Sequence, residues 1–391
     1  MQTMGPQRFG AFIAPYHAPG GNPTLQIQRD LELACHLDRL GFDEAWIGEH
    51  HSAGYEIVAS PEVFIAAAAE RTKRIRFGTG VNSLPYHHPL MLADRICQLD
   101  HQTMGRVMLG AGPGQLPSDA FMMGIDPARQ RDMMGEALDV IVPLLRGETV
   151  TAKTEWFELN EARLQLAPFS PGGIEMAVAS TISPSGANQA GRHGLSLLSL
   201  AAGDPAGFAT LDTNWDIYTK AAAAHGHPVD RSTWRLVTPV HLAETREQAL
   251  REAEWGVLDL VRYIEGLSGM TMPWGSTAQQ AVKQWTTEGF PTFGIPVIGT
   301  PDDAIERIEQ LADKTAGFGT FLILALNIAD PTSSRRSYEL FAERVIPHFT
   351  QVNRQRTASM AWANRNSERF IGALTQAATA AFDKHQQAAA N

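Results

Sequence analysis

Residues 78–89 of the chain read GTGVNSLPYHHP and follow a short strand-like run at residues 74–77. The two glycines lack a Cβ, so the backbone here can come close to something flat or charged. The Leu-Pro pair ends the strand, because proline has no N–H to donate to a neighbouring strand. His87 and His88 follow at once. The stretch predicts a strand end with polar side chains at its mouth, although a plain glycine-rich turn explains the same residues.

The same order of a strand followed by a helix recurs eight times along the chain. The strand-like runs are residues 8–14, 43–48, 74–80, 106–110, 174–179, 195–200, 236–242 and 319–326. They are apolar throughout rather than alternating, as parallel strands are when both faces are covered. With no break in composition, the pattern predicts the α/β class and a single (β/α)8 TIM barrel over residues 1–352.

The histidines cluster at one predicted rim of this barrel. His50 and His51 follow the second strand-like run, and His87 and His88 follow the third. In barrels of this kind the chemistry lies at the carboxyl ends of the strands. We therefore expect the functional site at that rim.

Two segments depart from the repeat. Residues 266–296 are rich in Gly, Pro, Met and Trp and are too long for an ordinary connection, so we predict a lid before the eighth strand. Its apolar side chains predict a pocket wall, while packing inside an ordinary insertion explains them equally well. These side chains are Met270, Met272, Trp274, Phe290 and Phe293. Residues 353–391 are alanine-rich toward their end and predict a helical C-terminal extension that packs on a partner subunit, most simply in a homodimer.

Composition narrows the function further. The chain has 391 residues, and 32 Lys and Arg against 42 Asp and Glu give a net charge of −10, which argues against nucleic-acid binding. The two cysteines, Cys35 and Cys97, argue against a disulfide framework. We see no signal peptide and no apolar run of about 18 residues, so we expect a cytoplasmic protein without a membrane segment.

Glu49, His50 and His51 supply acid–base groups. A histidine titrates near neutral pH, and a neighbouring carboxylate can orient it. A metal site would need several ligands that converge at set spacing, and the histidine pairs have no carboxylate partner of known geometry. We therefore expect no metal, and the remaining alternative is a structural histidine pair.

A second polar loop, STISPS at residues 180–185, lies between a strand and a helix start. Proline after a serine is typical of a helix N-terminus. Backbone N–H groups there, with the hydroxyls of Ser180, Thr181, Ser183 and Ser185, predict a phosphate site. A simple capping cluster is the equally supported alternative.

Five motifs occur in order: EHH at 49–51, GTGVNSLPYHHP at 78–89, GRVMLGAGPG at 105–114, ASTISPS at 179–185 and GTPDDAIERI at 299–308. Together they resemble the bacterial luciferase-like flavin-dependent monooxygenases, over about residues 8–350. The runs at 42–57 and 84–100, and the C-terminal tail, are most similar to the limonene 1,2-monooxygenase subgroup.

The resemblance implies a two-component enzyme. A separate NAD(P)H:flavin reductase supplies reduced FMN, which reacts with O2 to give a C4a-(hydro)peroxyflavin. This species inserts one oxygen atom into a small apolar substrate, with a terpene-like alkene as the best expectation. The family's catalytic histidine corresponds to His50, with Glu49 and His51 beside it.

The resemblance also implies a flavin site at the strand ends. Its residues are Gly80, Val81, Asn82, Gly112, Ser180, Thr181, Ser183 and Ser185, with a cis peptide at Gly80–Val81. The luciferase cysteine that faces the flavin corresponds to Gly112, and a phosphate-contacting arginine of the family corresponds to Pro113. The phosphate must then rely on residues 180–185 or on Arg192.

Other activities fit the same residues. The flavin chemistry could instead give Baeyer–Villiger oxidation or hydroxylation. A deazaflavin-dependent oxidoreductase of the same superfamily would turn over without oxygen, and a non-enzymatic flavin-binding protein would tolerate the loss of His50.

Overall fold

The computed structural model describes residues 5–269, 271, 273–291 and 293–390. In these residues eight parallel strands close into a barrel, because β12 pairs with β1 and β10, and β10 also pairs with β9. The barrel strands are β1 Arg8–Ile13, β2 Glu44–Ile47, β3 Arg76–Thr79, β5 Val107–Gly112, β8 Glu175–Ser180, β9 Ser196–Ser199, β10 Arg235–Leu242 and β12 Thr320–Ala325. The predicted single (β/α)8 barrel is confirmed, and each strand overlaps the run from which it was predicted.

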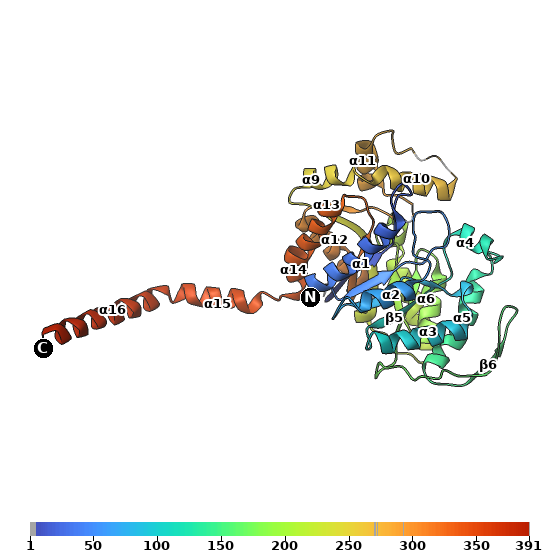
Figure 1. Ribbon diagram of the computed structural model, residues 1–391, viewed down its shortest axis with the longest axis horizontal. Coiled ribbons are helices and arrows are strands. Elements are labelled where there is room, and N and C mark those ends of the chain that lie inside the picture. Colours follow the sequence, from blue (N-terminus) through green and yellow to red (C-terminus); the bar gives the residue numbers. More distant parts are fainter. Residues whose placement is uncertain (1–4, 270, 272, 292, 391) are drawn as a thin grey trace. The chain divides into compact units, whose positions relative to one another are not determined.

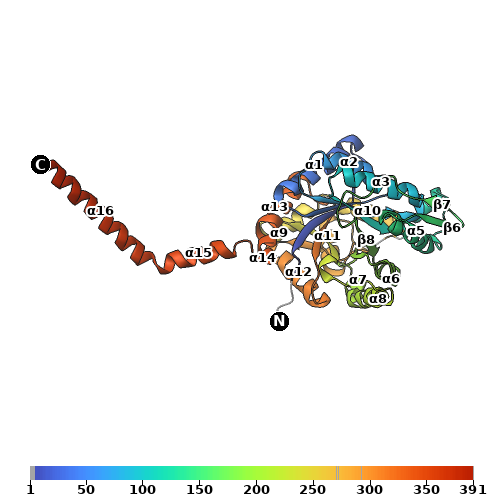
Figure 2. The same ribbon diagram turned by 90° about the horizontal axis from the view of Figure 1, so that it is seen from below.

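Helices form a ring around the strands (Figures 1 and 2). They are α1 Pro23–Leu40, α2 Pro61–Ala69, α3 Pro89–Gln102, α4 Pro117–Met122, α5 Gln130–Leu145, α6 Pro184–His193, α7 Pro205–Ala209, α8 Leu211–Ala224, α9 Arg246–Ala253, α10 Val257–Ser268, α11 Ala278–Glu288, α12 Pro301–Thr315 and α13 Pro331–Leu340, with a π-helical turn, η3, at Phe341–Val345. The short helix α14 Ile346–Thr350 follows η3 in the chain. Figure 1 shows α9, α10 and α11 together over one end of the barrel.

Local sequence explains where helices start and stop. The Asn22 side chain accepts hydrogen bonds from the backbone N–H groups of Thr24 and Leu25, and Pro23 occupies the first turn of α1. Gly41 then ends α1 in the left-handed conformation, at φ 87°. Both features are standard helix boundaries, so local sequence sets where α1 begins and ends.

The glycine-rich stretch at 78–80 is explained first by packing. The indole of Trp46 fills the barrel interior, and a Cβ on Gly78 would lie 2.3 Å from its Cε3 atom. A Cβ on Gly110 would lie 2.9 Å from the same ring. The flat group that approaches Gly78 is therefore a core tryptophan.

The amino ends of the strands are closed by buried charges. The Arg235 guanidinium donates to both carboxylate oxygens of Glu44, at 2.7 and 2.9 Å, and to Glu175 at 2.6 Å. Arg76 also donates to Glu175, at 2.7 Å. Every charge in this group has a partner of opposite sign, so this end of the barrel is filled and neutralised.

The connections hold more helix than the sequence predicted. The loop after β5 contains α4, two helices, α7 and α8, follow β9, and two more, α9 and α10, follow β10. The predicted lid segment contains α11, and a short strand, β11 Val297–Gly299, pairs with β10. An antiparallel hairpin, β6 Val150–Lys153 and β7 Glu158–Ala162, follows α5.

The chain divides into two compact units, which meet at residues 346–347. The first unit holds the barrel. The second holds α15 Arg354–Arg365 and α16 Ser367–Ala390, so the C-terminal extension is helical as predicted. In the described residues, every helix is too short or too polar to cross a membrane.

Candidate functional site

A cavity of about 640 Å³ opens at the carboxyl ends of the barrel strands. Its wall takes at least one residue from, or close after, each of the eight strands: Phe12, Glu49, Gly80, Pro113, Ser180, Leu200, Val237 and Leu324. Helix α10 adds Tyr263, Ile264, Leu267 and Ser268 as a cover. The volume falls in the range of small-molecule and cofactor sites, and the position is the one predicted for the site.

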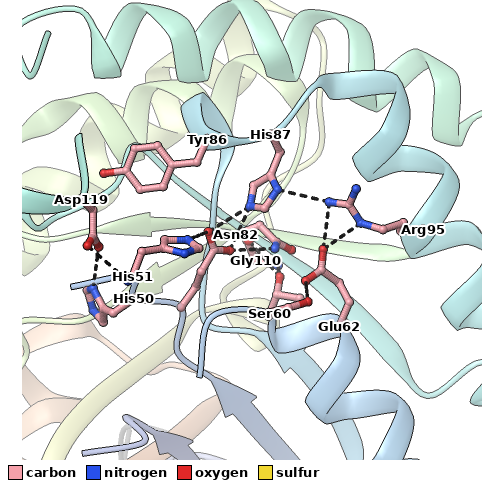
Figure 3. Close-up of polar contacts among 12 residues, drawn as sticks. His50, His51, Ser60, Glu62, Asn82, Tyr86, His87, Arg95, Gly110 and Asp119 are labelled. Atoms are coloured by element: carbon pink, nitrogen blue, oxygen red, sulfur yellow. Dashed lines mark hydrogen bonds and ion pairs between the residues drawn. The ribbon is translucent and has the colours of Figure 1, made fainter. Parts of the chain in front are cut away.

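His50 stands on this wall between two carboxylates. Its Nδ1 atom lies 3.3 Å from Oδ2 of Asp119, and its Nε2 atom lies 3.4 Å from Oε2 of Glu56. A carboxylate only accepts hydrogen bonds, whereas both nitrogens of a charged imidazole donate. The surroundings of His50 therefore favour the imidazolium, and Figure 3 shows the ring directed toward Asp119.

The charges around His50 determine its acidity. Burial by itself lowers the pKa of this histidine, but the negative charges of Glu56 and Asp119 outweigh burial and raise the pKa above its usual value. Burial correspondingly raises the pKa of Asp119, and its hydrogen bonds from His50 and Ser52 outweigh that and lower it. His50 thus keeps its proton to a higher pH than an ordinary histidine does, and it can hold or deliver that proton as an acid.

Glu49 is the centre of a second hydrogen-bond network, whose members His51, Asn82 and His87 are labelled in Figure 3. Its buried carboxylate lies 3.1 Å from His51 Nε2 and 2.9 Å from His87 Nε2, and it accepts from Asn82 at 3.0 Å. Arg95 donates to His87 Nδ1 at 3.2 Å, so Nε2 is the nitrogen of His87 that donates to Glu49.

This network holds Glu49 ionised. Burial raises the pKa of Glu49, but the hydrogen bonds from His51 and His87 outweigh it and lower the pKa. The hydrogen bond that His51 donates to Glu49 in turn raises the pKa of His51. Glu49 itself reaches the cavity wall, whereas His51 and His87 stand behind it.

Of the residues predicted for the flavin ring, Gly80 and Val81 line the cavity, whereas Gly112 and Asn82 lie behind its wall. The Gly80–Val81 peptide bond is cis, and both residues line the cavity. A Cβ on Gly112 would lie 2.4 Å from Cγ2 of Val81, so glycine at 112 is required by this contact. Asn82 is fully buried and is bonded to Glu49 rather than placed on the cavity wall.

The serine-rich loop also lines the cavity, with all four predicted hydroxyl residues: Ser180, Thr181, Ser183 and Ser185. Ser183 caps α6 by accepting from the N–H of Ser185 at 3.3 Å, while the Ser180 hydroxyl is buried without a hydrogen-bond partner among the described residues. Arg192 lies in the last turn of α6 and is paired with Asp139 at 2.7 Å. It is not on the cavity wall.

The predicted lid residues divide into two groups, in so far as the structure describes them. Phe293 lines the cavity. Trp274 and Phe290 instead stack on each other, with ring centroids 3.9 Å apart, inside an apolar cluster with α10 and α11. Met270 and Met272 lie outside the described residues. The cover of the cavity therefore comes largely from α10, which begins before the predicted lid.

Sequence reasoning missed Glu56, Asp119, Arg131 and Tyr263. Glu56 lies in the run GYEI, five residues beyond His51, and carries no motif of its own. Asp119 lies on α4, a helix that was not predicted. Arg131 lies on α5 and reaches the cavity wall, with neither a hydrogen bond nor an ion pair to any described residue. In the described part of the chain, no group of three or more His, Cys, Asp or Glu side chains is arranged to hold a metal ion.

Comparison with known proteins now identifies the family. Residues 7–316 match the family described as luciferase-like monooxygenase. The chain is 48% identical over 370 residues to limonene 1,2-monooxygenase of Rhodococcus erythropolis, covering 95% of this chain and 93% of that protein. It is 44% identical to 4-hydroxyprotoasukamycin monooxygenase of Streptomyces nodosus subsp. asukaensis, covering 90% and 95% of the two chains.

A solved structure agrees with these relatives. The oxygenating constituent of 3,6-diketocamphane monooxygenase from Pseudomonas putida, a type II Baeyer–Villiger enzyme in complex with FMN, superposes with a TM-score of 0.70. It is 28% identical, and the match covers 88% of this chain and 98% of that one. This protein is therefore an enzyme of the luciferase-like, flavin-dependent monooxygenase family.

Proposed function

We propose that this protein is a two-component monooxygenase that uses reduced FMN from a separate flavin reductase. In this proposal it inserts one oxygen atom of O2 into a small apolar substrate, with a terpene-like alkene as the expected class, and the other oxygen leaves as water. The observation that carries the proposal is His50, held between two carboxylates on the wall of a covered cavity.

The residues present fit FMN. The buried Ser180 hydroxyl lacks a partner within the described residues, and a buried polar group of this kind normally has one. Arg131 brings to the same cavity a guanidinium that the described residues leave unpaired. A guanidinium is well suited to bind a phosphate, so Arg131 together with the loop at 180–185 would hold the phosphate end. Gly80 and Val81 would lie along the ring system.

When bound and reduced, the flavin would supply the electrons that activate O2. The protein's own part is to control protons and water. His50 can hold a proton at Nε2 or deliver it from there, with Asp119 fixing the ring through Nδ1. Glu49 stays ionised at the cavity wall and adds a fixed negative charge.

The remaining wall favours an apolar substrate. Phe12, Leu200, Val237, Phe293 and Leu324 line the cavity, and α10 covers it. An apolar, covered cavity excludes water, which protects a reactive oxygen species from side reactions. The similarity to a limonene monooxygenase supports the alkene, while the camphor-derived ketone named for the solved relative makes Baeyer–Villiger oxidation the outcome to test against it.

The test is a reconstituted reaction. Purified protein is mixed with a flavin reductase, NADH, FMN, air and limonene, with a bicyclic ketone as a second substrate, and the products are identified by gas chromatography. We expect an epoxide from limonene and no product when the reductase is omitted.

Two results would contradict the proposal. Turnover under strict anaerobiosis with a reduced deazaflavin would favour the oxidoreductase alternative. A lactone from the ketone, with no product from limonene, would show that the substrate is a ketone and not an alkene. The flavin-dependent oxygenation would then still stand.

A further inference from the structure

Glu56 has contacts on both of its carboxylate oxygens. Its Oε2 atom lies 3.4 Å from Nε2 of His50, and its Oε1 atom accepts a hydrogen bond of 2.8 Å from the hydroxyl of Tyr263. Tyr263 lies on α10, the helix that covers the cavity. The Glu56 carboxylate thus contacts both His50, the acid of the site, and α10, the helix that covers the cavity.

The segment that carries Glu56 is itself fixed to α10 by aromatic packing. The rings of Tyr55 and Tyr263 have centroids 4.8 Å apart, and Tyr16 stacks on Tyr55 at 5.5 Å. Tyr16 and Glu56 also form a backbone bridge. A displacement of α10 would therefore act on Glu56 directly.

Tyr263 can only donate in this arrangement. Burial raises the pKa of its hydroxyl, and the charge of Glu56 raises it further, so the proton stays on the tyrosine. The hydrogen bond exists only while α10 lies over the cavity. If the helix moved away, the Glu56 carboxylate would gain water and its attraction for the His50 charge would weaken.

We propose that Glu56 is a positioning residue that links the charge on His50 to the closed position of α10, through the hydroxyl of Tyr263. Only the role of this link depends on the proposed function: it would keep His50 protonated while the cavity is covered. The link itself is a property of the flavin-free chain.

Linkage fixes the direction of the effect. The closed cover places Glu56 against His50, so His50 binds its proton more tightly in the closed form than in the open one. By reciprocity, protonation of His50 favours the closed form. Protection of α10 should be greatest below the titration of His50 and should fall as the pH rises through it. The other titratable groups that face His50 are Glu49, Asp119 and His51, and the charge of Asp119 also acts on Tyr263. A variant of Glu56 leaves all three in place, so it isolates the contribution of Glu56.

The test has two measurements on the full-length, flavin-free protein. The first is the titration of His50 by NMR, assigned with His50→Asn. The second is hydrogen exchange of the amides at 257–268, expressed as protection factors at several pH values. In the wild type we expect protection to fall about tenfold across the His50 titration, which corresponds to a coupling of about one pH unit.

Two variants separate the parts of the link. Glu56→Gln removes the charge, and because an opposite charge at this distance shifts a pKa by about one unit or more, the His50 titration should move down by at least about one pH unit. Tyr263→Phe removes only the hydroxyl, and protection of α10 should fall and lose its dependence on pH.

Tyr16→Phe is the matched control. Tyr16 is buried in the same aromatic cluster, but its hydroxyl has no hydrogen-bond partner in the described part of the chain. We expect this variant to behave as the wild type in both measurements. Equal effects of Tyr16→Phe and Tyr263→Phe, or an unchanged His50 titration in Glu56→Gln, would overturn the proposal. Neither result depends on turnover, so the proposed function would stand or fall separately.

Discussion

The two ends of the barrel both hold charged clusters, but the clusters are built differently. At the amino ends of the strands, Arg235 joins Glu44 and Glu175 through hydrogen bonds of 2.6 to 2.9 Å. At the carboxyl ends, His50 stands between Glu56 and Asp119 at 3.4 and 3.3 Å. The same strands, β2 and β8, contribute residues to both ends.

The difference lies in whether the cation can lose its charge. Arginine is always protonated, and its charge outweighs the burial of Glu175 and lowers the pKa of that carboxyl to about 2. The cluster of Arg235, Glu44 and Glu175 at the amino ends of the strands (the lower cluster) therefore keeps one charge state at any ordinary pH. Histidine titrates near neutrality, and the cluster of His50, Glu56 and Asp119 at the carboxyl ends (the upper cluster) faces a cavity. The lower cluster is suited to stability, and the upper one to proton transfer.

The largest effect should come from removing the titrating group. His50→Asn keeps a polar side chain but cannot hold a proton, and loss of general acid catalysis typically costs about 10²- to 10⁴-fold in rate. We expect a loss in this range in the reconstituted oxygenation, with the unfolding midpoint nearly unchanged. His51→Asn, which removes a neighbour of Glu49 behind the cavity, should cost less than about tenfold. Equal losses in the two variants would mean that the upper cluster acts only as a unit.

The second prediction removes the cation from the cluster at the amino ends of the strands. Arg235→Met leaves Glu44 and Glu175 buried without their shared cation, and breaking a buried ion pair from one side costs about 3–5 kcal/mol. Urea unfolding should show this loss at neutral pH, and the pKa of Glu175 should rise from about 2. A variant as stable as the wild type would show that this cluster is not needed for stability.

A smaller effect is expected at the phosphate end of the cavity. Arg131→Gln should weaken binding of reduced FMN about tenfold, since one charge-assisted hydrogen bond contributes about 1.5–3 kcal/mol before compensation. Binding of reduced riboflavin, which has no phosphate, should not change. Arg192→Gln is the control, because Arg192 is already paired with Asp139. Anaerobic titrations of both flavins into the wild type and the two variants give the six dissociation constants needed.

The smallest effect is on the pH dependence of stability. The folded pKa of His50 is raised, so its contribution is fully present below its unfolded pKa of 6.5 and is lost as the pH rises through the folded pKa. The free energy of unfolding in the wild type should therefore decline as the pH rises above 6.5 and through the folded pKa of His50. In His50→Asn this decline should be absent. A decline of the same size in the variant would assign it to other groups.

Much of the fold could be predicted from local signals. Buried runs such as residues 319–326 are apolar without alternation, and helix boundaries such as Pro23 and Gly41 have their own chemistry. The lid was harder to predict, because Gly, Pro and Met mark an irregular segment without saying what it packs against. Trp274 and Phe290 entered an apolar cluster, while α10, which looks like an ordinary barrel helix, supplied the cover.

Part of the candidate site could also be predicted from local signals. His50, Glu49 and the serines of 180–185 follow strands directly, so their place at the rim was visible in the sequence. Glu56 and Asp119 reach His50 from a loop and from α4, and Tyr263 reaches Glu56 from α10, across 207 residues of chain. Contacts of that separation depend on how the chain closes, and no spacing rule encodes them. At Gly78 the local signal was misleading. A glycine expected to lie near a ligand instead makes room for the indole of Trp46.

The most direct test of the central claim is the origin of the inserted oxygen. The reconstituted enzyme is supplied with ¹⁸O2 in ordinary water, and the product formed from limonene is analysed by mass spectrometry. We predict one ¹⁸O atom in each product molecule. Product that carries oxygen only from water, or product formed equally well without O2, would contradict the account.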